Sequence, residues 1–315
     1  MSRPAVAVIG GGAWGLALAG AAARTGGTTL LLSRRAHDGA LPTGVTLARD
    51  ESEVATRARL ILLAVPSGVA REVARSLGAH VDGGHFVVHG VRGLVGEAME
   101  SISSVVRDET PVRRVGALGG PALAADLLAG RPSVMVCGSH YPEVNRALQQ
   151  AFGSPTLRLY ATDDLLGLEW ASALVGCLAI GVGYARGIGL GPGLIAAVIT
   201  RAVEEGARLA AAAGGNERTL LGLAGYGDLL ASIAQGERPE VLVGEALAAG
   251  KTLEQALSQV SQRVEAVELT ARVVTWAESG GIRAPVFGAL ARGILRGRAS
   301  DALIRELMTG PIAEA

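Results

Sequence analysis

Apolar residues in the first half of the chain form short β-type runs that alternate with longer runs of helical spacing. Alternate apolar positions predict a strand, whereas apolar positions three and four residues apart predict a helix. Strands that alternate with helices are typical of a parallel sheet covered by helices on both faces. We therefore expect strands at 5–9, 28–33, 60–66, 85–89, 114–118, 133–137 and 156–160, and helices at 16–23, 68–77, 96–106 and 141–152.

The strand pattern stops at Asp163, and the rest of the chain is typical of consecutive helices. Asp163 and Asp164 suit a helix N-cap. We predict a doubly wound α/β domain over residues 1–162 and an all-helical domain over residues 163–315. A cleft between two such domains is a usual place for a small-molecule substrate. Glycine-containing breaks separate the predicted helices at 187–193, 214–215, 225–227, 236–239 and 280–281.

The composition narrows the class of protein. The 315 residues are 49% hydrophobic and 18% charged, with a formal net charge of zero, which favours a folded protein with large buried interfaces over a nucleic-acid binder. Cys137 and Cys177 lie in apolar runs, so we expect no disulfide and a reducing, cytoplasmic setting. We predict no metal site. The apolar helices after Asp163 suggest a homodimer, because an interface would cover their surplus hydrophobic surface.

Two apolar stretches raise the alternative of a membrane segment or a signal peptide. Residues 5–23 carry no charge, but the glycines inside this stretch would make a poor spanning helix. Residues 170–200 are interrupted by Arg186 and the glycine-rich segment 187–193. We therefore expect two buried core helices in the second stretch and no membrane span in either.

A glycine turn joins the first predicted strand to the first predicted helix. Its sequence is Gly-Gly-Gly-Ala-Trp-Gly over residues 10–15. Gly10, Gly12 and Gly15 have the spacing that places the pyrophosphate of a dinucleotide at a helix N-terminus, with Ala13 and Trp14 beside it. The alternative is a glycine-rich turn that binds nothing.

The next strand ends offer further contacts for a dinucleotide. Ser33-Arg34-Arg35 follows the second strand without an acidic residue, which favours NADP over NAD, because a guanidinium suits the 2′-phosphate. A solvated pair of surface arginines is the alternative. Pro66, at the end of a later run, predicts a loop near the nicotinamide ribose, and Ser67 is a further candidate contact.

With these motifs in place, the chain resembles the NAD(P)-dependent glycerol-3-phosphate dehydrogenases over nearly its full length. The resemblance implies a Rossmann domain, a helical substrate domain and reversible hydride exchange between a nicotinamide and dihydroxyacetone phosphate. It also implies a role in phospholipid precursor metabolism. The matching stretches are 8–15, 64–67, 119–121, 178–181, 187–189, 198–201, 224–229 and 264–265.

Some of the functional residues that the resemblance implies are kept in this chain, and others are replaced. The family's catalytic lysine and the asparagine after it fall on Val175 and Gly176, and a third family lysine falls on Ala125. A second family lysine falls on Arg92, which keeps the charge. The family's Arg-Asn pair for the substrate phosphate aligns near Arg238-Pro239-Glu240, so Arg238 serves with a shift of one residue.

The loss of the lysine matters chemically, because the alkoxide left by hydride transfer needs a proton and a nearby positive charge. Lys251 is the sole lysine of the chain and lies far from Val175 in the sequence. The catalytic candidates are Asp228 and His89, and Glu169 and Trp170 could border the site. From the resemblance and the motifs, the cofactor-binding candidates are Gly10, Gly12, Ala13, Trp14, Gly15, Arg34, Arg35, Pro66, Arg92, Ala124 and Glu265, and the substrate-binding candidates are Gly120, Ser232 and Arg238.

Three functions stay open at this point. The first is a glycerol-3-phosphate dehydrogenase activity, on that substrate or a relative. The second is a reductase of another substrate whose chemistry needs no lysine. The third is a non-catalytic NADPH-binding protein, since an intact glycine turn stands beside an altered catalytic centre.

Overall fold

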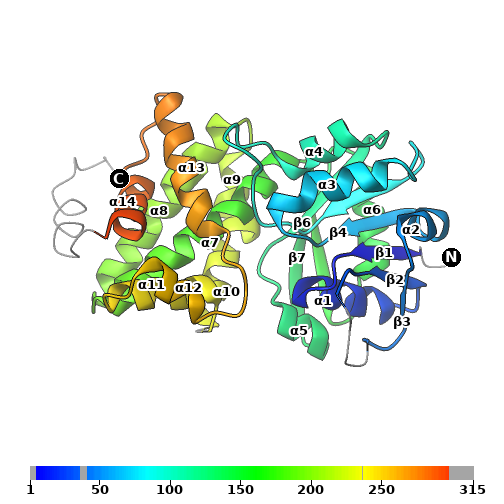
Figure 1. Ribbon diagram of the computed structural model, residues 1–315, viewed down its shortest axis with the longest axis horizontal. Helices are drawn as coiled ribbons and strands as arrows, with labels where there is room; N and C mark the ends of the chain where they lie inside the picture. The colour runs from blue at the N-terminus through cyan, green and yellow to red at the C-terminus, as the bar shows by residue number, and fades with distance from the viewer. Residues whose placement is uncertain (1–4, 36–40, 236, 298–315) are drawn as a thin grey trace.

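The computed structural model describes residues 5–35, 41–235 and 237–297, and it divides into a sheet half and a helical half (Figure 1). The sheet has eight strands in the order β3-β2-β1-β4-β5-β6-β7-β8. The expected α/β fold with a helical second half is thus confirmed. The strands are β1 (Val6–Ile9), β2 (Thr29–Leu32), β3 (Val45–Leu47), β4 (Leu60–Leu63), β5 (Phe86–His89), β6 (Arg114–Gly119), β7 (Ser133–Gly138) and β8 (Leu157–Thr162).

The sheet is parallel except at one pair. β6 and β7 run antiparallel, with Leu118 opposite Cys137, so the expectation of a wholly parallel sheet is wrong at this point. A parallel crossover must return the chain to the other end of the sheet. The short helix α5 (Ala124–Ala129) instead packs against α1 (Ala13–Ala23), and β7 runs back beside β6.

The helices of the sheet half are α1, α2 (Glu51–Arg57), α3 (Ser67–Gly78), α4 (Ile102–Glu109), α5 and α6 (Pro142–Phe152). Sequence periodicity missed β3, α2 and α5, all too short to show a clear period. It also placed the start of α4 too early. Ser101 caps α4 by accepting a hydrogen bond from the Ser104 amide, and Gly96 adopts φ +63° in the preceding loop.

The helical half surrounds one central helix, α7, and contains α7 (Leu165–Gly187), α8 (Pro192–Ala212), α9 (Glu217–Leu221), the π-helical turn η1 (Leu223–Gly227), α10 (Asp228–Ala234), α11 (Pro239–Ala248), α12 (Leu253–Ser258), α13 (Ala266–Ser279) and α14 (Pro285–Arg296). The break expected at 187–193 separates α7 from α8. Among the described residues, α7 is the one helix long and apolar enough to cross a membrane, but 89% of its most apolar window is buried inside the protein. It is a core helix.

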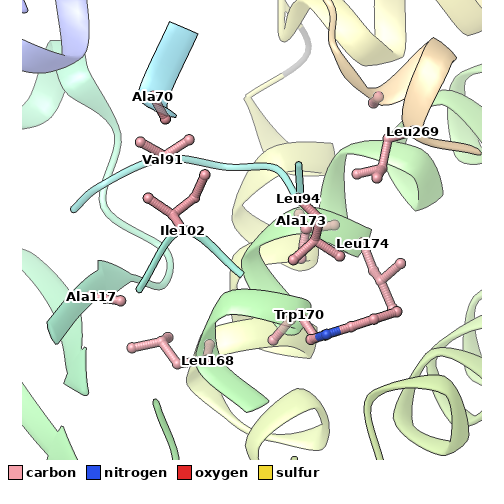
Figure 2. Close-up of a cluster of buried hydrophobic side chains, with 14 of the residues drawn as sticks. Ala70, Val91, Leu94, Ile102, Ala117, Leu168, Trp170, Ala173, Leu174 and Leu269 are labelled. Atoms are coloured by element: carbon pink, nitrogen blue, oxygen red, sulfur yellow. The ribbon is translucent and has the colours of Figure 1, made fainter. Parts of the chain in front are cut away.

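One hydrophobic core joins the two halves. It runs from Ile61 and Val87 in the sheet to Leu168, Trp170 and Leu174 on α7. Figure 2 draws part of this core, with side chains from both halves. The rings of Trp170 and Trp276 are tilted against each other with centroids 4.8 Å apart, and Trp170 is buried in the core. The loops at the carboxyl ends of the strands are therefore held against the helical half.

Candidate active site

The glycine turn after β1 is required by packing at two of its three motif positions. Gly10 adopts φ +124°, and a Cβ there would collide with the carbonyl oxygen of Ala64 after β4. A Cβ on Gly15 would collide with the carbonyl oxygen of Gly10. This tight approach lies between β1 and β4, where the order of the strands reverses and α/β folds bind their ligands.

Gly12 is different. Its backbone is extended, at φ −78° and ψ 176°, and a Cβ there would meet nothing within 4 Å. Neither conformation nor packing therefore demands glycine at this position. Gly12 is the N-cap of α1, and no side chain caps that helix. The open space beside uncapped amide groups fits the pyrophosphate of a dinucleotide.

Other cofactor candidates line the same edge of the sheet. Arg34 and Arg35 are exposed directly after β2. Trp14, in the first turn of α1, lies against Gly90 after β5, where a Cβ would clash with the indole nitrogen. Pro66 is exposed in the loop between β4 and α3. Ala13 is exposed at the start of α1, and the half-buried Ala124 begins α5.

A charged cluster lies further along this edge, where the sheet half meets the helical half. Arg92 Nη1 lies 2.8 Å from Asp228 Oδ2, and Arg92 Nη2 donates a hydrogen bond to Asp228 Oδ1 at 3.1 Å. Arg92 also contacts the carbonyl oxygen of Gly120 at 3.4 Å. Nη1 of Arg238 lies 3.7 Å from Asp228 Oδ1 and donates to the hydroxyl of Ser232. The structure thus brings Arg92 and Gly120 of the sheet half together with residues 228–238 of the helical half.

The two ends of this cluster differ in exposure. The Asp228 side chain is fully buried, whereas the Arg92 side chain is 31% exposed. Burial raises the pKa of the Asp228 carboxyl above its ordinary value, and the guanidiniums of Arg92 and Arg238 oppose that rise. Arg92 is therefore the most exposed of these three charged side chains, and the carboxylate of Asp228 fixes its guanidinium.

Glu240 belongs to this cluster and was not a sequence-based site candidate. Its Oε2 lies 2.8 Å from Nε of Arg238, and its side chain is 19% exposed. A Cβ on Gly176 of α7 would lie 3.6 Å from the other carboxylate oxygen. Val175, the neighbour of Gly176, is 2% exposed and belongs to the hydrophobic core.

Glu265 joins the two halves beside the cluster. Its carboxylate accepts hydrogen bonds from both the amide and the hydroxyl of Ser67, at the first residue of α3. Gly93, next to Arg92, packs against this contact, because a Cβ there would crowd Ser67 and Glu265. Glu265 therefore holds the amino end of α3 to the helical half.

His89 sits in a buried polar network below the cluster. Its Nε2 lies 2.9 Å from Glu169 Oε1, and its Nδ1 accepts from the Val91 amide at 3.4 Å. Glu169 also accepts hydrogen bonds from the amide and hydroxyl of Ser103. Both ring nitrogens thus have partners within the protein. This arrangement suits a residue that positions the 90–93 loop.

Two further kinds of reactive group are relevant to the chemistry: a metal site and the two cysteine thiols. Among the residues that the structure describes, no group of three His, Cys, Asp or Glu side chains could hold a metal ion. Cys137 and Cys177 are free and buried, and burial raises the pKa of Cys137 to about 11 and that of Cys177 to about 12. Neither thiol is a nucleophile at neutral pH.

Comparison with known proteins identifies the family. Residues 32–145 match the family model described as the NAD-dependent glycerol-3-phosphate dehydrogenase N-terminus, and residues 164–305 match the C-terminus. The glycerol-3-phosphate dehydrogenase [NAD(P)+] of Teredinibacter turnerae is 32% identical, over 98% of this chain and 95% of its own. That of Moorella thermoacetica is also 32% identical, over 98% and 97%.

A solved structure gives the same result. The crystal structure of glycerol-3-phosphate dehydrogenase from Coxiella burnetii is 26% identical and superposes with a TM-score of 0.89, covering 98% of this chain and 99% of the other. Ketopantoate reductase from Ralstonia eutropha, at 19% identity and a TM-score of 0.57, shares the fold. The chain belongs to the NAD-dependent glycerol-3-phosphate dehydrogenase family.

Proposed function

We propose that the protein is an NAD(P)H-dependent oxidoreductase that interconverts dihydroxyacetone phosphate and glycerol 3-phosphate. The observation that carries this proposal is the half-exposed Arg92, fixed by the buried Asp228 beside Gly120, on the same sheet edge as the open space at Gly12. A cofactor site and a cationic substrate site next to each other are what hydride transfer to a small anionic ketone requires. The names of the relatives support the same substrate.

The bound nicotinamide would supply or accept the hydride. The chain's own residues bind the substrate and polarise its carbonyl group. Arg92 places a fixed positive charge where a carbonyl oxygen can become an alkoxide, and such a preorganised group contributes on the order of 10² to 10³ in rate. Asp228 acts as a positioning residue, because it is fully buried and touches Arg92.

We further propose that the reaction proceeds without the lysine that the family resemblance places at Val175. Valine cannot donate a proton, and arginine has too high a pKa to release one. The alkoxide is therefore held by Arg92 and takes its proton from solvent. Losing a positioned acid lowers the rate by about 10² to 10⁴, so turnover is slow.

NADP is the proposed cofactor. Two exposed guanidiniums, Arg34 and Arg35, follow β2, and no acidic residue accompanies them at positions 33–35. A guanidinium binds the 2′-phosphate of NADP, whereas NAD needs a carboxylate for its free hydroxyl. Replacing both arginines by alanine should weaken NADPH binding by about tenfold or more and leave NADH binding unchanged. Arg113→Ala, at the opposite edge of the sheet, is the matched control.

We also propose the division into domains at residue 162, a homodimer and a cytoplasmic location. β8 ends at Thr162 and α7 begins at Leu165, between the two family matches.

Exposed leucines on neighbouring elements, Leu221, Leu223 and Leu230, offer apolar surface for a second copy. The buried thiols suit a reducing compartment. Light scattering on the purified protein measures the dimer directly.

The decisive experiment combines binding with turnover. NADPH and NADH are titrated against the purified protein by fluorescence, and NADPH oxidation is then followed with dihydroxyacetone phosphate at high enzyme concentration. We expect tight NADPH binding and slow turnover that Arg92→Ala abolishes. Tight binding with no turnover at any enzyme concentration would contradict the proposed activity and favour a non-catalytic NADPH-binding protein.

A further inference from the structure

Glu240 stands in the first turn of α11 and holds Arg238 from within the charged cluster. Its Oε2 lies 2.8 Å from Nε of Arg238, and the two side chains are 19% and 8% exposed. Nη1 of Arg238 is turned to the Ser232 hydroxyl and lies 3.7 Å from Asp228. Two edges of the Arg238 guanidinium are therefore in contact with the protein.

The charges of the cluster balance. Arg92 and Arg238 contribute two positive charges, and Asp228 and Glu240 contribute two negative charges. A phosphate dianion that binds near Arg238 therefore meets no surplus positive charge among these four side chains. Inside a protein this lack of surplus positive charge weakens phosphate binding strongly, because the effective dielectric constant is well below that of water.

We propose that Glu240 is a specificity-determining residue, which competes with the phosphate of the substrate for Arg238. The phosphate is admitted when the Glu240 carboxylate leaves Nε of Arg238, and the competition weakens the binding of phosphorylated substrates relative to uncharged ones. This inference rests on the proposed function, since it takes the substrate to be dihydroxyacetone phosphate.

The position of Glu240 allows this displacement. Its carboxylate faces Gly176 of α7, which carries no side chain to block it, and it remains partly exposed at the edge of the cluster. Asp228 has no such freedom, because it is fully buried under Arg92. Of the two carboxylates beside Arg238, Glu240 is therefore the one that can move.

The test uses Glu240→Gln, which keeps the shape of the side chain and an acceptor for Nε of Arg238 while removing the charge. Glu237→Gln is the matched control, because Glu237 is exposed and loses the same charge nearby. Binding of glycerol 3-phosphate is measured by calorimetry, and kcat and KM are measured with dihydroxyacetone phosphate and with dihydroxyacetone.

We expect Glu240→Gln to bind glycerol 3-phosphate about tenfold more tightly and to lower KM for dihydroxyacetone phosphate to a similar extent. KM for dihydroxyacetone and all values for Glu237→Gln should stay within about twofold. Unchanged or weaker binding of glycerol 3-phosphate by Glu240→Gln would overturn the proposal. So would an equal gain in Glu237→Gln, since net charge alone would then explain it.

The calorimetric arm separates this inference from the proposed function. If neither protein turns over dihydroxyacetone phosphate, the proposed activity fails, but tighter binding of glycerol 3-phosphate by Glu240→Gln still supports the role of Glu240. If both proteins turn over and bind alike, the activity stands and the role of Glu240 is overturned.

Discussion

The two parts of the site are built in different ways. The cofactor cradle is made of backbone: Gly10 and Gly15 allow strand and helix to approach closely, and Gly12 leaves space at a helix end. The charged cluster joins the side chain of Arg92 in the sheet half to those of Asp228 and Arg238 in the helical half, which meet only because the two halves pack together. The shape of the cradle depends on a few residues close in the sequence, whereas the geometry of the cluster depends on every charged partner being present.

Removing Arg92 should break the charged cluster most severely. Arg92→Ala leaves Asp228 fully buried without its closest counter-charge, which costs about 3 kcal/mol of unfolding free energy. Turnover should be lost as well, while NADPH binding survives in the folded fraction. Urea unfolding and NADPH titration measure the two effects. Arg113→Ala, which removes an exposed arginine of the sheet half, should change neither.

The cradle can be probed with two glycines that differ in their reason for being glycine. Gly10→Ala should cost about 2 kcal/mol, because the backbone is at φ +124° and the Cβ collides with Ala64. Gly12→Ala should change stability by less than about 0.5 kcal/mol and yet weaken NADPH binding roughly tenfold. Equal NADPH affinity in Gly12→Ala and the unaltered protein would show that this space is not the pyrophosphate site.

These two regions also explain how much of the site could be predicted from the sequence. Gly10, Gly12 and Gly15 are close in the sequence and their spacing has a steric meaning, so the glycine turn between the first strand and the first helix was predictable. The pairing of Glu169 with His89 has no local signal, because the two residues lie 80 positions apart and meet only where α7 packs against the sheet. Glu240 and Arg238 are two positions apart, but that spacing alone does not indicate a site. The antiparallel β7 was missed for a related reason, since α5 is too short to show where the chain turns.

A fall in pH should disturb the charged cluster before it weakens cofactor binding at the cradle. Burial raises the pKa of Asp228 above its ordinary value, and the charged groups that face it are Arg92, Arg238 and Glu240. As pH falls, Asp228 is therefore protonated earlier than an exposed aspartate, and Arg92 loses the charge that fixes it. We expect kcat/KM to fall on the acid side while NADPH affinity holds. In Asp228→Asn the rate should be low throughout, and this acid limb should disappear; an unchanged limb would assign the titration to another group.

The smallest effect is expected where the two halves are joined by Ser67 and Glu265. Ser67→Ala removes the hydroxyl hydrogen bond but leaves the amide of Ser67 bonded to the carboxylate, so it should cost about 1 kcal/mol and lower Tm by a few degrees. Ser76→Ala is the control, because it removes an exposed hydroxyl hydrogen bond, to Glu51, on the same helix α3.

A double-mutant cycle with Glu265→Ala then asks whether this contact couples the cradle to the cluster. The α3 amino end lies beside the β4 loop of the cradle, and Gly93 ties the same contact to Arg92. If the contact carries coupling, the two changes together should weaken NADPH binding by less than the product of their separate effects, because either change alone already breaks the link. Strictly multiplicative effects on NADPH binding would mean that the cradle and the cluster act independently, and that the shared core alone aligns them.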